Sequence, residues 1–182
     1  MLYLLEDKRS SLRKIYLSKS FLMNLKNFFF SDILIVFIIF LVDRISKLYV
    51  IHLDGTLLNS EIITSKYINI QLIWNEGVAF GLFAFDDKFF YNLITGFIIV
   101  IILILIFFIK KTTGIEKYSF LIILAGALGN VFDRFLYSAV PDFIDIHYQN
   151  FHWFIFNVAD IFITLGVILL IYAEIFLKNK KI

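Results

Sequence analysis

The chain has 182 residues, of which 60% are hydrophobic, and its mean hydropathy is +0.87. This composition excludes an ordinary soluble globular domain and indicates one integral membrane domain. A net charge of +2 gives no reason to expect a nucleic-acid partner, and the lack of cysteine excludes disulfides, thiol nucleophiles and thiolate zinc sites.

The first 27 residues are basic and lack the short apolar core and cleavage site of a removable signal peptide. We expect residues 1–27 to form a basic cytoplasmic leader. Four apolar stretches follow, each long enough to cross a hydrocarbon core about 30 Å thick. They cover about 28–51, 89–109, 118–135 and 155–177, so we expect a four-span membrane domain over 28–177 and a cytoplasmic tail at 178–182.

The two long connections differ in pattern. Within residues 52–88, the stretch 66–74 alternates polar and apolar residues, which is typical of a half-buried strand. The connection 136–154 holds the only proline and many aromatics, which suit a membrane–water interface. The expected fold is therefore an all-α membrane protein with a small extracytoplasmic β-sheet in 52–88 and a short interfacial segment between the third and fourth spans.

Lys and Arg residues outside the spans are unevenly distributed. The leader, the turn at 110–117 and the tail hold twelve of them, whereas the two long connections hold only Lys66 and Lys88. Because positive residues favour the cytoplasmic side, both termini and the 110–117 turn are expected inside, and the two long connections outside.

Three spans carry polar residues at helical spacing, so that each set shares one helix face. A charged residue facing lipid costs about 2.5 to 3.5 kcal/mol, and each therefore needs an explanation. The small residues among them would allow close helix approach. The sets are Asp43, Ser46 and Lys47; Gly126, Gly129, Asn130 and Asp133, with Arg134 adjacent; and Asn157, Asp160 and Thr164.

With the predicted orientation, all three sets lie near the outer surface, beside Asp142 in the adjoining connection. Pairs such as Asp43 with Lys47, or Asp133 with Arg134, can be structural ion pairs that hold the bundle together. Asp142 and Asp160 have no adjacent base in sequence. Two carboxylates close together in a partly dry site share a proton, so that one can act as general base and the other as general acid.

Five sequence blocks in order resemble the lipoprotein signal peptidase family, also called signal peptidase II. The blocks are 43–47 (DRISK), 75–81 (NEGVAFG), 129–134 (GNVFDR), 140–143 (VPDF) and 156–160 (FNVAD). The resemblance implies that Asp142 and Asp160 form the dyad of an aspartic endopeptidase. It implies further that this dyad removes the signal peptide of a prolipoprotein just before a diacylglyceryl-modified cysteine, without a metal or cofactor.

The resemblance also assigns supporting positions around the site. Asp133 competes with Asp142 for a place in the dyad, but the neighbouring charge of Arg134 would favour its permanent ionisation. Two positions depart from the family pattern: Arg44 stands where Gln is common, and Pro141 precedes the proposed catalytic Asp142. The expected substrate-binding or supporting residues are Asp43, Lys47, Asn75, Gly77, Asn130, Asp133, Arg134 and Asn157.

The implied partners are a lipid-modified prolipoprotein and membrane lipids, and the implied location is the bacterial inner membrane, with a monomer expected. The alternative from another class is a small proton-coupled transporter, since intramembrane Asp and Lys also mark ion pathways. A transporter predicts acids near mid-membrane and often repeated halves. This sequence shows polar clustering at one surface and no repeat.

Overall fold

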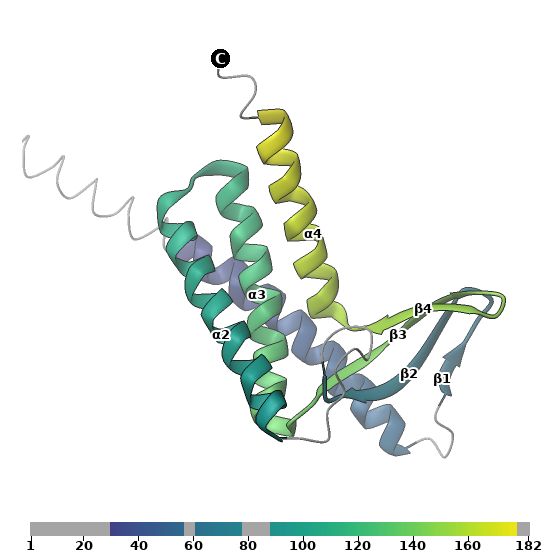
Figure 1. Ribbon diagram of the computed structural model, residues 1–182. Coiled ribbons are helices and arrows are strands. Elements are labelled where there is room, and N and C mark those ends of the chain that lie inside the picture. Colours follow the sequence, from purple (N-terminus) through teal and green to yellow (C-terminus); the bar gives the residue numbers. More distant parts are fainter. Residues whose placement is uncertain (1–29, 57–60, 78–87, 178–182) are drawn as a thin grey trace, which may run out of the picture. The chain divides into compact units, whose positions relative to one another are not determined.

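The computed structural model describes residues 30–56, 61–77 and 88–177 (Figure 1). The predicted leader, the tail and the last four residues of the 75–81 block lie outside this part of the chain. The contacts divide the chain into the units 1–35 and 36–182, and the second unit carries every side chain of the site described below.

Residues 30–56 form one helix, which covers the first predicted span. It is followed by α2 (Lys88–Lys111), α3 (Gly114–Tyr137) and α4 (Val158–Tyr172), and α4 continues into the π-helical turn η2 (Ala173–Leu177). Within the described residues, three segments are long and apolar enough to cross a membrane. These are Tyr91–Lys111, Gly114–Tyr137 and Val158–Leu177.

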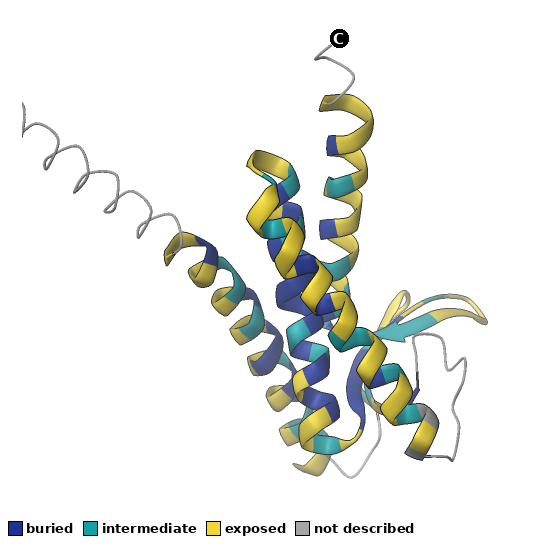
Figure 2. Ribbon diagram, turned by 60° about the vertical axis from the view of Figure 1, so that its left-hand side comes forward, coloured by how far each residue is buried: buried dark blue, intermediate teal, exposed yellow. Residues whose placement is uncertain are grey.

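The helix α3 is the most buried of these three segments. Ile123, Leu124 and Val131 of α3 pack with Ile102 and Leu105 of α2 in the hydrophobic core. In Figure 2, α3 is dark blue along much of its length, whereas α2 and α4 are largely yellow. Because most exposed side chains of α2 and α4 are large and apolar, these surfaces suit contact with lipid.

A four-stranded antiparallel sheet follows the order β1-β2-β3-β4. The strands are β1 (Glu61–Thr64), β2 (Ile68–Asn75), β3 (Val140–Tyr148) and β4 (Phe151–Phe156). Strand β2 confirms the strand predicted from the alternation at 66–74.

The sheet is larger than the one predicted within 52–88, because the connection 136–154 forms β3 and most of β4. The interfacial position of this connection stays a prediction. A tight turn at Gln149 and Asn150 joins the two strands, and Gln149 adopts the positive φ of 52° that such turns favour. Pairing with β2 then satisfies the backbone groups that an irregular segment would leave unpaired. Because 151–156 is a strand, the fourth helix begins at Val158 and not near 155.

The sheet connects directly to the membrane helices. Ser138 ends α3 in the left-handed conformation, with φ of 58°, and β3 starts two residues later. Asn157, directly after β4, caps the N-terminus of α4. These short junctions hold Asp142, near the start of β3, close to Asp160 in the first turn of α4.

Candidate active site

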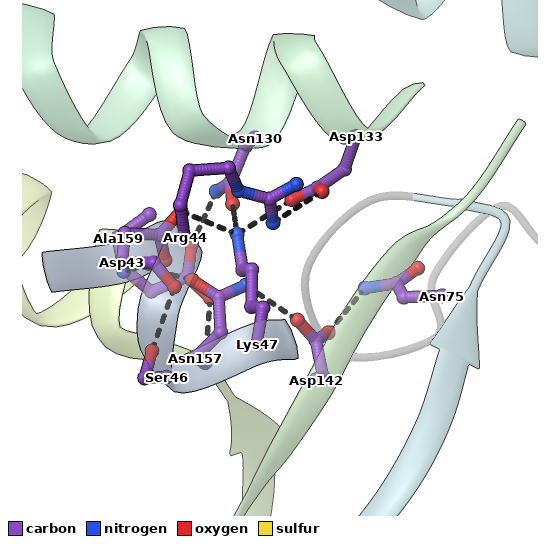
Figure 3. Close-up of polar contacts among 11 residues, drawn as sticks. Asp43, Arg44, Ser46, Lys47, Asn75, Asn130, Asp133, Asp142, Asn157 and Ala159 are labelled. Atoms are coloured by element: carbon purple, nitrogen blue, oxygen red, sulfur yellow. Dashed lines mark hydrogen bonds and ion pairs between the residues drawn. The ribbon is translucent and has the colours of Figure 1, made fainter. Parts of the chain in front are cut away.

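Asp142 is a buried carboxylate that accepts hydrogen bonds from two side-chain amides (Figure 3). Its Oδ2 accepts from Asn75 Nδ2 at 2.9 Å, and its Oδ1 accepts from Asn157 Nδ2 at 2.6 Å. The antiparallel pairing of β2 with β3 brings Asn75 to this position. The pKa of Asp142 is raised from its ordinary value of 3.8 to about 6, first by burial and second by the nearby charge of Asp160. The two amides and Lys47 act in the opposite direction and limit this rise.

Asp160 belongs to the capping box of α4. Its backbone N–H donates to Asn157 Oδ1 at 3.1 Å, and its Oδ2 accepts from the backbone N–H of Asn157 at 3.1 Å. Its other oxygen, Oδ1, accepts from Asn130 Nδ2 at 2.8 Å. Since Asn157 donates to the Asp142 carboxyl from its side chain and to the Asp160 carboxyl from its backbone N–H, one residue orients both acids.

The two acids line the same cavity, which has a volume of about 400 Å³ and is also lined by Asn130, Arg134 and Asn157. A second cavity of about 680 Å³ lies between β2 and β4, with a mainly aromatic and aliphatic lining. Asp142 and Asn75 line both cavities. Asp142 therefore lies where a ligand in the larger cavity would meet the polar groups of the smaller one.

Lys47 joins three polar groups behind the two acids. Its Nζ donates to Asp43 Oδ2 at 3.0 Å, to Asn130 Oδ1 at 2.9 Å and to Asp133 Oδ2 at 2.7 Å. The predicted local pair of Asp43 and Lys47 is present and fully buried. Asp43 Oδ1 also accepts from the backbone N–H of Ala159 at 2.9 Å, so the helix 30–56 is tied to the start of α4.

Asp133 is paired with Arg44 and Lys47. Arg44 Nη2 lies 2.5 Å from Asp133 Oδ1, an ion pair without hydrogen-bond geometry. Arg134 instead donates to the carbonyl oxygen of Gly77, and its guanidinium lies 5.2 Å from the centre of the Tyr91 ring. The proposed pairing of Asp133 with Arg134 is therefore wrong, because consecutive residues on a helix point about 100° apart.

The structure thus brings all the predicted site residues into one region of the unit 36–182. It adds three groups that sequence reasoning did not assign to the site: the Arg44 guanidinium, the Tyr91 ring and the backbone N–H of Ala159. Arg44 could have been assigned from the sequence, because it is a cation directly after Asp43 within an apolar span. No residue type signals a backbone donor, because every residue except proline has one.

Comparisons with known proteins agree with the sequence blocks. The family model described as signal peptidase (SPase) II matches residues 35–176. A lipoprotein signal peptidase of Pelagibacter ubique is 48% identical over 159 residues, which are 87% of this chain and 95% of that protein. Another, from Thermodesulfovibrio yellowstonii, is 37% identical over 147 residues, covering 77% of this chain and 91% of that protein.

Two solved structures have the same fold, and both are described as bacterial membrane enzymes studied by the in meso method. One, at 2.3 Å resolution, has a TM-score of 0.66 and 32% identity, and covers 82% of this chain and 89% of that chain. The other, at 1.9 Å, has a TM-score of 0.64 and 31% identity, and covers 80% and 93%. With the family model matching most of the chain, these relatives show that the protein belongs to the signal peptidase II family.

Proposed function

We propose that this protein is a membrane-bound aspartic endopeptidase that removes signal peptides from lipid-modified prolipoproteins, cutting before the diacylglyceryl-modified cysteine. One observation carries the aspartic assignment: Asp142 and Asp160 line one cavity and are both held by Asn157. Among the described residues, neither acid takes part in an ion pair. A pair in this setting is suited to sharing one proton.

The ionised carboxylate of the pair accepts a proton from water, and the water oxygen attacks the carbonyl carbon of the scissile peptide bond. The protonated carboxyl donates its proton to the carbonyl oxygen, which gives a neutral tetrahedral intermediate. When this intermediate collapses, one of its hydroxyl groups gives a proton to the ionised carboxylate, the C–N bond breaks and the leaving amine takes a proton from the protonated carboxyl, so that the dyad again holds one proton. The amide groups of Asn75, Asn130 and Asn157 keep both carboxyl groups oriented through these steps.

The partners of Asp133 argue against a place in the dyad. It contacts the cations of Arg44 and Lys47, at 2.5 and 2.7 Å, and both favour its ionised form. An acid whose ionised form is stabilised by two cations is a poorer proton donor to the substrate than one without an ion pair. We therefore assign Asp133 a supporting role, together with Asp43 and Lys47.

The membrane arrangement that fits this reaction has four spans in the bacterial inner membrane, with the helix 30–56 as the first. The distribution of Lys and Arg favours cytoplasmic termini, which would put the sheet and the dyad near the outer surface. A diacylglyceryl-modified substrate keeps its acyl chains in the bilayer, so the acids must lie near an interface.

The assignment is tested by giving the purified protein a diacylglyceryl-modified prolipoprotein and measuring cleavage. We expect Asp142→Asn and Asp160→Asn each to lower the rate by about 10³-fold or more, since the reaction needs both acids. Lys111→Gln, at the far end of α2, is the control for an altered charge and should retain activity. Full cleavage by either aspartate variant would refute the dyad.

The comparisons give no support to the proton-coupled transporter that the sequence left open. The same purified protein in liposomes offers a direct check. A transporter would move protons or a solute across the liposome membrane in the absence of prolipoprotein. A peptidase would move neither, and would release cleaved peptide when prolipoprotein is added.

A further inference from the structure

The negative and positive side chains buried around the two acids nearly cancel in charge. Among the described residues, four carboxyl groups and three cations line the smaller cavity or belong to the hydrogen-bonded cluster behind it. Charges buried together are strongly disfavoured unless they nearly cancel. Four acids and three cations cancel when one acid holds a proton. The carboxyl groups are those of Asp43, Asp133, Asp142 and Asp160, and the cations are Arg44, Lys47 and Arg134.

Arg44 is connected to the dyad by an unbroken chain of contacts. Its guanidinium lies 2.5 Å from Asp133, which accepts from Lys47 at 2.7 Å. Lys47 also donates to Asn130 at 2.9 Å, and Asn130 donates to Asp160 at 2.8 Å. Figure 3 shows Arg44, Asp133 and Lys47 side by side. A change in charge at Arg44 therefore reaches Asp160 through buried groups, where solvent screening is weak.

Other titratable groups face this region but are placed differently. Glu76, after β2, and His152, on β4, line the larger cavity and are exposed. The Tyr91 ring lies against Arg134 and is uncharged as a phenol. Exposed charges are screened by water and salt, so the buried groups dominate the balance.

We propose that Arg44 is a positioning residue for the reaction: its charge balances that of Asp133 in the cluster that reaches the dyad through Lys47 and Asn130, and so sets the dyad to hold a single proton. Its guanidinium also lies 5.2 Å from the centre of the Phe132 ring, which helps to hold it against Asp133. This inference rests on the proposed function, because it concerns the protonation of that same dyad.

Removing the Arg44 charge leaves four acids with two cations. Electrical balance then requires two protons, so both acids of the dyad would be protonated at a pH where the wild type holds one. A doubly protonated dyad lacks the ionised carboxylate that activates water. Removing the Asp133 charge has the opposite effect, because the three cations then balance three acids without any shared proton.

The experiment is the pH dependence of kcat/KM for cleavage of a diacylglyceryl-modified prolipoprotein. Arg44→Gln should shift the acidic limb of the kcat/KM profile to higher pH by about one pH unit. Asp133→Asn should shift the same limb to lower pH by a similar amount. The double variant Arg44→Gln/Asp133→Asn should return the limb close to the wild-type position. Arg44→Lys retains the charge and should also keep it there, and Lys111→Gln controls for a distant loss of charge.

A second readout does not depend on activity. Infrared spectra across the same pH range report the protonated carboxyl groups directly, and the dyad band is assigned by its loss in Asp142→Asn and Asp160→Asn. The band should persist to higher pH in Arg44→Gln and disappear at lower pH in Asp133→Asn. If Arg44→Gln does not fold, Asp133→Asn and Arg44→Lys still test the inference.

The outcomes separate the two proposals. If the wild type cleaves nothing at any pH, the proposed function fails, and the infrared titration alone decides the role of Arg44. If the wild type cleaves but Arg44→Gln and Asp133→Asn leave the limb and the carboxyl band unmoved, or move them in the same direction, the role of Arg44 is overturned. The dyad assignment would survive that result.

Discussion

At the scale of single residues, the partners of each buried acid decide its chemistry. Asp43 and Asp133 each contact a cation, whereas the hydrogen bonds that Asp142 accepts from the described residues come from side-chain amides. Amide donors orient a carboxyl group without holding it permanently ionised. Asp142 can therefore change its protonation during a reaction cycle, while the other two acids support the structure around it.

The raised pKa of Asp142 predicts how stability depends on pH. The folded protein binds this proton more tightly than the unfolded chain, so the stability associated with it is present below pH 3.8 and is lost as the pH rises through about 6. Asp142→Asn removes this dependence. Between about pH 4 and pH 8, the free energy of unfolding of the variant should rise relative to wild type by up to about 3 kcal/mol.

Denaturant unfolding in detergent, measured at several pH values, checks this expectation. Glu76→Gln removes an exposed carboxyl group close to Asn75 in the chain and is the control for the change in net charge. Parallel stability curves for wild type and Asp142→Asn would contradict the raised pKa.

At the scale of elements, the small residues of α3 decide how closely the helices approach. A Cβ atom on Gly126 would lie 2.5 Å from the backbone oxygen of Ala159, and one on Gly129 would lie 2.5 Å from Asp43 Oδ2. The first contact is with backbone, which cannot rotate away. The spacing of these glycines therefore predicted correctly that another helix packs against this face.

Gly126→Ala should force α4 away from α3 and move Asp160 from Asn130. We expect a loss of about 1 to 3 kcal/mol in the free energy of unfolding, and cleavage reduced by up to about 100-fold for a displacement near 1 Å. Gly96→Ala in α2 is the matched control, because its Cβ would have no atom within 4 Å. The control should be as stable as wild type or slightly more stable, since alanine favours a helix. If the two variants had the same stability and the same cleavage rate, the contact between α3 and α4 at Gly126 would not be a tight one.

At the scale of the whole molecule, the proposed orientation can be tested with single cysteines, because the chain contains none of its own. Asn150 lies in the exposed turn between β3 and β4, and Thr113 lies between α2 and α3. In spheroplasts, a membrane-impermeant maleimide should label Asn150→Cys, and it should label Thr113→Cys only after permeabilisation. The reverse pattern would place the dyad on the cytoplasmic side.

The helices and the polar faces could be predicted from the sequence because they depend on local properties. Apolar length alone indicates a membrane helix, and a spacing of three or four residues puts polar groups such as Asp43 and Lys47 on one face. The strand at 66–74 was also visible, because its alternation is local. The hairpin of β3 and β4 was missed, although two aromatic-rich segments around a tight turn are a recognisable signal.

The sequence by itself determined the membrane class and the family, since each depends on composition or on order along the chain. Only the tertiary structure decided which polar groups of different elements meet. Asp133 pairs with Arg44 across two helices and not with its neighbour Arg134, and Asn157 reaches Asp142 from a different element. Such pairings depend on how helices and strands pack at distances of a few ångströms, and residue spacing within one element carries no information about them.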